Sequence, residues 1–184
     1  MTYLVGKDIK LVKFTEKFVV QKYIQWLNDH DVNRYMCGGR IPISKEEVGE
    51  RNDKNNVIFA IMSSLSYDKD GDQLVEGDFH SEFIGTIGVN GIDWINRKGE
   101  IGYMIGEKTH WGAGLATEAV NLISDYALNR LNLHKIEAGV VKGNTGSVKV
   151  LEKNGFKEYA TVPQDYWLEG EYHDVLRFYR LQEW

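Results

Sequence analysis

The stretch from Glu100 to Leu131 constrains the fold of this chain more than any other segment. Its first six residues, Glu100–Ile105, predict a strand, the glycine-rich run from Gly106 to Gly114 predicts a loop, and apolar residues at helical spacing from Leu115 onward predict a helix with one buried face. A glycine-rich turn that enters a helix presents backbone N–H groups that the helix leaves unpaired, and the helix dipole adds positive charge there. The stretch therefore predicts a site for a phosphate or pyrophosphate group.

Two common phosphate-binding loops fit this segment poorly. The nucleotide P-loop requires Lys and Ser or Thr after its last glycine, where this chain has Leu115 and Ala116. The dinucleotide fingerprint requires Gly or Ala where Thr117 stands. The sequence therefore disfavours both kinds of loop.

The segment WGAGLATEA, which runs from Trp111 to Ala119, resembles the acetyl-CoA pyrophosphate loop of the GNAT superfamily of N-acetyltransferases. The pattern of that loop is Q/R-x-x-G-x-G/A, and Gly114 and Ala116 fill its fourth and sixth positions. Trp111 fills the first position, where Gln or Arg is commoner, and in this it resembles the subgroup that acetylates ribosomal protein N-termini (RimJ/RimL-like) and its small-molecule relatives.

Two further segments carry the same resemblance. WLNDHDVNRYM, from Trp26 to Met36, is similar to a W-x-N-D-x-x-V segment that the family places over the acceptor site. Without the resemblance, this segment would be interpreted as an ordinary helix–turn–helix connection. The stretch from Lys142 to Ala160 is similar to the family segment N-x-x-S-x-x-V-x-E-K-x-G-F. The matching residues there are Asn144, Ser147, Val150, Glu152, Lys153, Gly155 and Phe156. The resemblance covers nearly the whole chain and is strongest from Ile84 to Phe156.

The resemblance implies an α/β (α+β) GNAT fold in one domain, residues 1–184. This fold has a mixed, mostly antiparallel, twisted sheet of about seven strands, a parallel splayed central pair and about four helices. The residues themselves support part of this architecture. The turn Asn96–Gly99 predicts an antiparallel hairpin, while the helix between Glu100–Ile105 and Lys135–Val141 predicts that these two strands are parallel neighbours.

The remaining elements follow from local patterns. We expect strands at Ile9–Phe14 and Val57–Met62, a strand with an irregularity near Asn90, and a final hairpin of Glu158–Val162 and Glu171–Leu181. We also expect three helices. The first is Glu16–Leu27, capped by Thr15, the second is short and begins with a capping box of Ser44 and Glu47, and the third runs from Ser147 to about Lys153 and ends at Gly155.

Composition limits the classes of function. The net charge of −5 argues against a general nucleic-acid binder, and no apolar run approaches the length of a membrane span. A single cysteine fits a reducing compartment, and the N-terminus lacks signal-peptide features, so we expect a cytoplasmic protein. We expect no metal site, because the acidic run Asp68, Asp70 and Asp72 does not match a calcium loop.

The resemblance implies that the protein binds acetyl-CoA. The residues that it assigns to the pyrophosphate loop are Trp111, Gly112, Ala113, Gly114, Leu115 and Ala116. The backbone of Met104 and Ile105 is expected to pair with the pantetheine arm. Asn144 is expected to bond the pantetheine amide or to fix its own loop, although it can also serve only as a turn residue.

The resemblance further implies direct transfer of the acetyl group to a primary amine in a ternary complex. Ser147 matches a serine thought to be the general acid for the leaving thiolate in the ribosomal-protein subgroup, so it is predicted to contact the cofactor as well. Its alternative role is simply to cap the helix that follows. Glu100 is the first candidate for the base, and its alternative is an ordinary carboxylate at the end of a hairpin.

The acceptor is expected between the N-terminal helices and the last hairpin, with Tyr35, Arg40, Trp94 and Tyr103 as candidate binding residues. A protein N-terminus or a small-molecule amine is one interpretation. GGRIP at Gly38–Pro42 and GIDWINR at Gly91–Arg97 resemble segments of bacterial acetyltransferases that act on nucleotide-linked amino sugars, and this resemblance implies such a sugar as a second interpretation. A non-catalytic acetyl-CoA-binding module is a third. A homodimer is common in the family.

Overall fold

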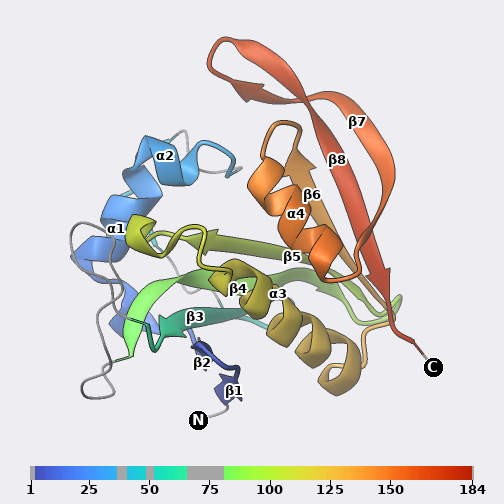
Figure 1. Ribbon diagram of the computed structural model, residues 1–184, viewed down its shortest axis with the longest axis horizontal. Coiled ribbons are helices and arrows are strands. Elements are labelled where there is room, and N and C mark those ends of the chain that lie inside the picture. Colours follow the sequence, from blue (N-terminus) through green and yellow to red (C-terminus); the bar gives the residue numbers. More distant parts are fainter. Residues whose placement is uncertain (1–2, 37–40, 49–51, 66–80, 184) are drawn as a thin grey trace.

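The computed structural model describes residues 3–36, 41–48, 52–65 and 81–183. Within these residues one eight-stranded sheet runs in the order β1-β2-β3-β4-β5-β6-β8-β7 (Figure 1). Its strands are β1 (Tyr3–Val5), β2 (Ile9–Lys13), β3 (Val57–Ser63), β4 (Glu82–Asp93), β5 (Lys98–Ile105), β6 (Lys135–Val141), β7 (Lys157–Leu168) and β8 (Glu171–Leu181). The α-helices are α1 (Gln21–Asn28), α2 (His30–Asn33), α3 (Leu115–Asp125) and α4 (Thr145–Lys153).

The predicted fold class is confirmed. All strand pairs but one are antiparallel, and the exception is the central pair β5 and β6. The helix α3 connects these two strands, which is why they run in the same direction. The sheet has one strand more than the seven expected, because the short strand β1 pairs with β2 at the edge.

Strands β5 and β6 separate along their length. Their pairing covers only the register from Lys98–Lys135 to Glu100–Glu137, although β5 continues to Ile105 and β6 to Val141. Figure 1 shows the two strands diverging, with α4 beside the opening. Beyond Glu100, the β5 edge that faces β6 therefore has no strand partner among the described residues, and its backbone groups can pair with a ligand.

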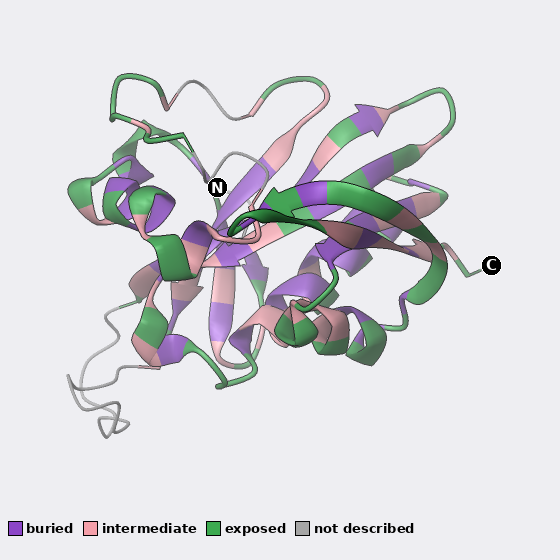
Figure 2. Ribbon diagram, turned by 90° about the horizontal axis from the view of Figure 1, so that it is seen from above, coloured by how far each residue is buried: buried purple, intermediate pink, exposed green. Residues whose placement is uncertain are grey.

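The two faces of the sheet are covered by different helices. Side chains alternate along a strand, so Met104 and Ile101 of β5 point to opposite faces. Met104 belongs to a buried cluster with Tyr23 and Trp26 of α1, whereas Ile101 belongs to the main core with residues of α3 such as Ile123. Figure 2 shows the buried residues concentrated between the sheet and its helices. The opening between β5 and β6 therefore connects the α1 side with the α3–α4 side.

Several local predictions are corrected. The helix expected at Glu16–Leu27 is a 3-10 turn (Glu16–Phe18) followed by α1, and Thr15 makes no side-chain cap. The chain is extended at Val20, which lets Phe18 pack on Phe14 and Phe83. Tertiary packing of these aromatic rings thus overrides the helical pattern.

The Ser44–Glu47 contact forms without the helix that it was expected to begin. The Ser44 N–H donates to the Glu47 carboxylate at 2.7 Å, but residues 45–47 form a turn. The predicted Arg40 site and the acidic run Asp68–Asp72 lie outside the described residues. Within the described residues, no helix is long and apolar enough to cross a membrane.

Candidate active site

A cleft of about 1270 Å³ opens where β5 and β6 separate. Its walls come from both strands, the loop before α3, the first turns of α4 and the residues around α2. Many of the predicted site residues line it: Tyr35, Glu100, Tyr103, Met104, Ile105, Trp111, Gly112, Gly114, Leu115, Ala116, Asn144 and Ser147. Segments far apart in the sequence therefore meet at one cavity of the size that binds small molecules.

The loop before α3 has the geometry of an anion site. Gly112 and Gly114 have φ angles of 80° and 83°, which side chains of L-residues rarely adopt, and open space surrounds both. Gly114 is the N-cap of α3 and supplies no side chain to cap it. The first N–H groups of α3 thus remain available, next to the positive end of the helix dipole. The loop fits a pyrophosphate group.

Trp111 fixes this loop to the end of β5. Its indole N–H donates to the Ile105 carbonyl at 2.8 Å, while about half of its surface stays exposed at the cleft. This hydrogen bond closes the turn Gly106–Trp111 against the strand. It supplies a structural reason for a tryptophan at a position where Gln or Arg is commoner.

Asn144, rather than Ser147, caps α4. The Asn144 side-chain oxygen accepts a hydrogen bond from the Ser147 N–H at 3.2 Å, and the helix begins at Thr145. The alternative interpretation of Ser147 as a helix cap is therefore wrong. Because Asn144 caps the helix, the Ser147 hydroxyl is free of that role on the wall of the cleft.

Tyr103 lines the cleft from the α3–α4 side. It shares a face of β5 with Ile101 and Ile105, and it packs on the main core, not on the N-terminal helices. Its hydroxyl is buried and has no hydrogen-bond partner in the described part of the chain. Burial raises the pKa of Tyr103, and the neighbouring Ser147 hydroxyl opposes that rise only in part. Tyr103 thus stays protonated and is a hydrogen-bond donor.

Glu100 lies on the opposite face and is held by Arg177 of β8. The guanidinium donates to the two carboxylate oxygens at 3.0 and 3.4 Å. This ion pair crosses β6 above Gly139, where an added Cβ would come within 2.7 Å of the Arg177 Nη1 atom. Sequence analysis missed Arg177, because a pair 77 residues apart leaves no local pattern.

Glu137 is a second carboxylate that sequence analysis missed. It is the register partner of Glu100 at the last paired position of β5 and β6, and it lines the same cleft. Burial alone would raise the pKa of Glu137. Hydrogen bonds from Lys135 and the Tyr159 hydroxyl, both 2.8 Å long, outweigh burial and lower it. Glu137 is therefore a fixed negative charge at the base of the cleft.

The predicted acceptor residues separate in the structure. Tyr35 lines the cleft. The hydroxyl of Tyr166 on β7 lies 2.9 Å from the carbonyl oxygens of both Arg34 and Met36, the residues on either side of Tyr35, and can donate its proton to either one. Trp94 lies elsewhere: it is about half exposed, does not line the cleft and donates from its indole N–H to the Lys54 carbonyl at 2.8 Å.

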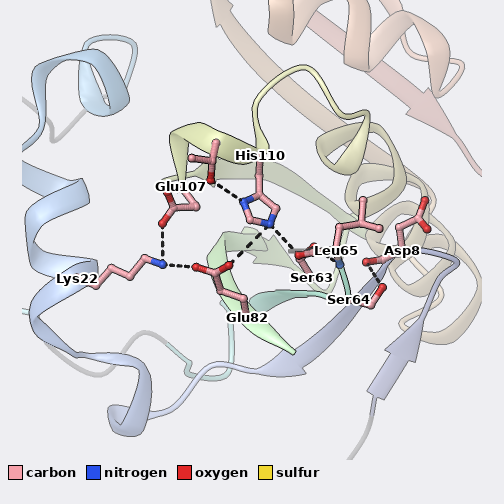
Figure 3. A network of polar contacts seen from close by, with 9 residues as sticks. Asp8, Lys22, Ser63, Ser64, Leu65, Glu82, Glu107 and His110 are labelled. Atoms are coloured by element: carbon pink, nitrogen blue, oxygen red, sulfur yellow. Dashed lines mark hydrogen bonds and ion pairs between the residues drawn. The ribbon is translucent and has the colours of Figure 1, made fainter. Parts of the chain in front are cut away.

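A polar network ties α1 to the loop after β5 (Figure 3). Lys22 lies between Glu82 and Glu107 at 2.5 and 2.6 Å. Buried His110 contacts the Leu65 carbonyl at 3.1 Å through Nε2. Burial alone would lower the pKa of Lys22, but its two carboxylate partners outweigh burial and raise it. The network therefore ties α1 and the start of β4 to the segment that leads into α3.

Comparison with known proteins agrees with this geometry. A family model described as an acetyltransferase (GNAT) domain matches residues 8–157, more than half of the chain. A solved structure of spermidine N-acetyltransferase from Vibrio cholerae, in complex with CoA and spermine, has a TM-score of 0.78 at 24% identity and covers 96% of this chain and 97% of that one. The fold of this chain is therefore shared with that structure over nearly the whole length of both.

Two curated relatives indicate the range of the family. Spermidine N(1)-acetyltransferase of Vibrio cholerae is 34% identical over 110 residues, 60% of this chain and 63% of that protein. YdaF of Bacillus subtilis, whose name assigns it to ribosomal N-acetyltransferases, is 31% identical over 107 residues, 58% of each chain. Two other Bacillus relatives match at 42% and 46% identity, and the matches span only 54% and 40% of their lengths. From the family match, the chain belongs to the GNAT acetyltransferase family.

Proposed function

We propose that the protein transfers an acetyl group from acetyl-CoA directly to the primary amine of a small molecule or a protein N-terminus. One observation carries this proposal. The pairing of β5 and β6 ends at Glu100–Glu137, and the cleft that opens there extends to the uncapped N-terminus of α3. Acetyl-CoA needs this combination: a site for its diphosphate, an open strand edge for its pantetheine arm, and access for the acceptor amine from the opposite side.

Each part of the cofactor has a matching group in this cleft. The N–H groups from Gly112 to Ala116 suit the pyrophosphate. Met104 and Ile105 pair with β4 on one edge, so their other edge is open to the pantetheine arm. Asn144 holds the N–H of Ser147, which supports the predicted role of fixing this loop.

Further basic residues at the cleft suit additional phosphate. Lys149 and Lys153 stand one helical turn apart on α4, and both line the cleft. Their charges would favour an anionic ligand that reaches past the pyrophosphate loop.

Ser147 is the residue that we propose as the general acid. Its hydroxyl is not needed to cap α4, and it stands on the wall where the leaving sulfur would lie. We propose Glu100 as the base that accepts a proton from the amine, through water, with Arg177 fixing the orientation of its carboxylate. Both assignments are predictions from position.

The acceptor amine would approach from the α1–α2 side. Glu100 and Glu137 place two carboxylates there, which favours an amine over an anionic group, although Arg177 and Lys135 moderate their charge. The relatives named as a spermidine N(1)-acetyltransferase and a ribosomal N-acetyltransferase support an amine acceptor, and the proposal therefore keeps both a small molecule and a protein N-terminus. We do not propose the amino-sugar alternative, because Trp94 of its GIDWINR segment does not line the cleft.

Release of free thiol from acetyl-CoA tests the proposal. The panel contains spermidine, a short peptide with a free N-terminus, the same peptide with a blocked N-terminus, and a nucleotide-linked amino sugar. We expect spermidine or the free peptide to accelerate thiol release, and the blocked peptide to have no effect. Acetyl-CoA binding without stimulation by any amine would contradict the enzyme assignment and favour a non-catalytic binding module.

A further inference from the structure

The hydroxyl of Tyr103 makes no hydrogen bond that would stabilise the fold within the described part of the chain. It is buried, and the described residues offer it no hydrogen-bond partner. A buried hydroxyl without a partner destabilises a folded protein, whereas phenylalanine would fill the same space in the core without that cost. Packing on the main core accounts for an aromatic ring at position 103, but it does not account for the hydroxyl group on that ring.

The hydroxyl of Ser147 neighbours that of Tyr103. Both residues line the cleft, Tyr103 from β5 and Ser147 from the first turn of α4. Ser147 is close enough to act on the ionisation of Tyr103, yet the two hydroxyls do not meet in good hydrogen-bond geometry. A small rotation of the serine side chain, which is half-buried and makes no cap, would join them.

We propose that Tyr103 is a positioning residue for Ser147: its hydroxyl donates a hydrogen bond to Ser147 Oγ and thereby turns the serine proton toward the open cleft. This inference rests on the proposed function. A serine hydroxyl has two acceptor lone pairs and one proton, so a donor on the β5 side leaves the proton to point away from β5. Tyr103 suits this role because burial raises the pKa of its hydroxyl, which favours the protonated, donating form.

The proton transfers of the reaction show when this hydrogen bond would stabilise Ser147. The amine nitrogen forms a bond to the acetyl carbon, the carbon–sulfur bond breaks, and the sulfur takes the proton of Ser147. The nitrogen loses one proton through water to Glu100, the proposed base, and Glu100 returns a proton through water to Ser147, so the products are an amide and a free thiol. While Ser147 lacks its proton, its oxygen carries negative charge, and a donated hydrogen bond to a charged oxygen is about twice as strong as one between neutral groups. The contact therefore matters most in the transition state.

The experiment compares Tyr103→Phe, Ser147→Ala and the double variant, with Tyr126→Phe as the control. Tyr126 packs on the same core but does not line this cleft. Three quantities are measured for each variant: kcat with saturating amine and acetyl-CoA, the Kd of acetyl-CoA, and the thermal unfolding midpoint of the ligand-free protein. We expect Tyr103→Phe to lower kcat about tenfold, since it removes one hydrogen bond to a charged group. Its Kd should stay the same, and its unfolding midpoint should be equal or higher.

The double variant separates positioning from a general loss of packing. If Tyr103 acts through Ser147, the double variant is no slower than Ser147→Ala alone, and Tyr126→Phe matches the wild type. An unchanged kcat for Tyr103→Phe in an active wild-type protein would overturn this inference and leave the proposed function intact. The inference would also be overturned if Tyr103→Phe lowered kcat by the same factor in the wild type and in Ser147→Ala, or if it lowered the unfolding midpoint. A wild type that releases no thiol with any amine would overturn the proposed function, and this inference with it.

Discussion

The two sides of the cleft are built in different ways. The side that we propose for acetyl-CoA, formed by the loop Gly106–Leu115 and the start of α4, relies on backbone N–H groups and on contacts between near neighbours such as Asn144 and Ser147. The side that we propose for the acceptor, formed by α2, β8 and the Glu100 face of the sheet, relies on contacts between distant residues. Tyr166 and Arg34 are 132 residues apart, and Arg177 and Glu100 are 77 apart.

This difference predicts that the two binding functions can be changed separately. Backbone groups keep their positions under most substitutions, so the acetyl-CoA side should tolerate side-chain variation except at its glycines. The acceptor side depends on individual side chains, so single substitutions there should alter acceptor affinity and leave acetyl-CoA affinity unchanged.

The largest expected effect is that of Gly114→Val. A β-branched side chain at a φ angle of 83° is strained, by roughly 1–2 kcal/mol, and it would displace the N–H groups of the loop. We expect acetyl-CoA affinity to fall tenfold or more, on the order of 1.4 kcal/mol or above. Isothermal titration calorimetry measures it.

Gly170→Val is the matched control. Gly170 has a φ angle of 92° and open surroundings, but it lies in the turn between β7 and β8, away from the loop. A similar loss of stability with normal acetyl-CoA affinity is expected. Equal losses of affinity in the two variants would mean that strain, not the loop, is responsible.

Ser147→Ala ranks second. We expect kcat to fall at least tenfold, about 1.4 kcal/mol in barrier height, with an unchanged Kd for acetyl-CoA. Helix α4 should persist, because its cap is Asn144. Thr145→Ala, which removes an exposed hydroxyl two residues away, should behave as the wild type in the same steady-state assay. Equal turnover of Ser147→Ala and wild type would remove Ser147 from the mechanism.

Arg177→Met should have a smaller effect, confined to the acceptor side. Glu100 would lose the guanidinium that orients it, so we expect the acceptor KM to rise about fivefold, roughly 1 kcal/mol, with acetyl-CoA affinity intact. Arg180→Met is the control on the same strand, since its nearest carboxylate is the exposed Asp125 at 4.0 Å. A change in acetyl-CoA affinity for Arg177→Met would break the proposed separation of the two sides.

The smallest expected effect concerns the pH dependence of stability. Burial would raise the pKa of Glu107, but the hydrogen bond and charge of Lys22 outweigh it and lower the pKa below the ordinary value of 4.5. The unfolded chain then binds the proton more readily, so this stabilisation is present above about pH 4.5 and is lost as the pH falls through the folded pKa.

Glu107→Gln tests that dependence. The pair is partly exposed, so the effect should be about 1 kcal/mol or less. Thermal unfolding from pH 6 to pH 3 should show a shallower decline for Glu107→Gln than for the wild type. Parallel curves would show that the Lys22–Glu107 pair adds no stability.

The fold was predictable where local pattern and tertiary contacts agree. Strand β6 has the predicted bounds, Lys135–Val141, and the hairpin of β4 and β5 forms with its irregularity after Asn90. In these segments the apolar period and the turn residues both favour the observed structure. The helix expected at Glu16–Leu27 failed, because packing of Phe18 on distant aromatic rings breaks it.

The parts of the candidate site that could be predicted are those whose residues lie within short sequence motifs. The loop from Trp111 to Ala116 and the pair Asn144–Ser147 lie in short motifs, and the structure brings them to one cleft. The partners Arg177 and Glu137, and the side of the sheet that Tyr103 occupies, follow from strand order and register. A single sequence carries no local signal for strand order, which is why these features were missed.

An amide NMR titration of the wild-type protein with acetyl-CoA tests directly whether the cofactor binds at the loop before α3. We expect the largest chemical-shift changes at the backbone amides from Gly112 to Ala116 and at Met104 and Ile105, with small changes in α1 and α2. Saturating acetyl-CoA without shifts in these amides, or with its main shifts elsewhere, would contradict that binding site.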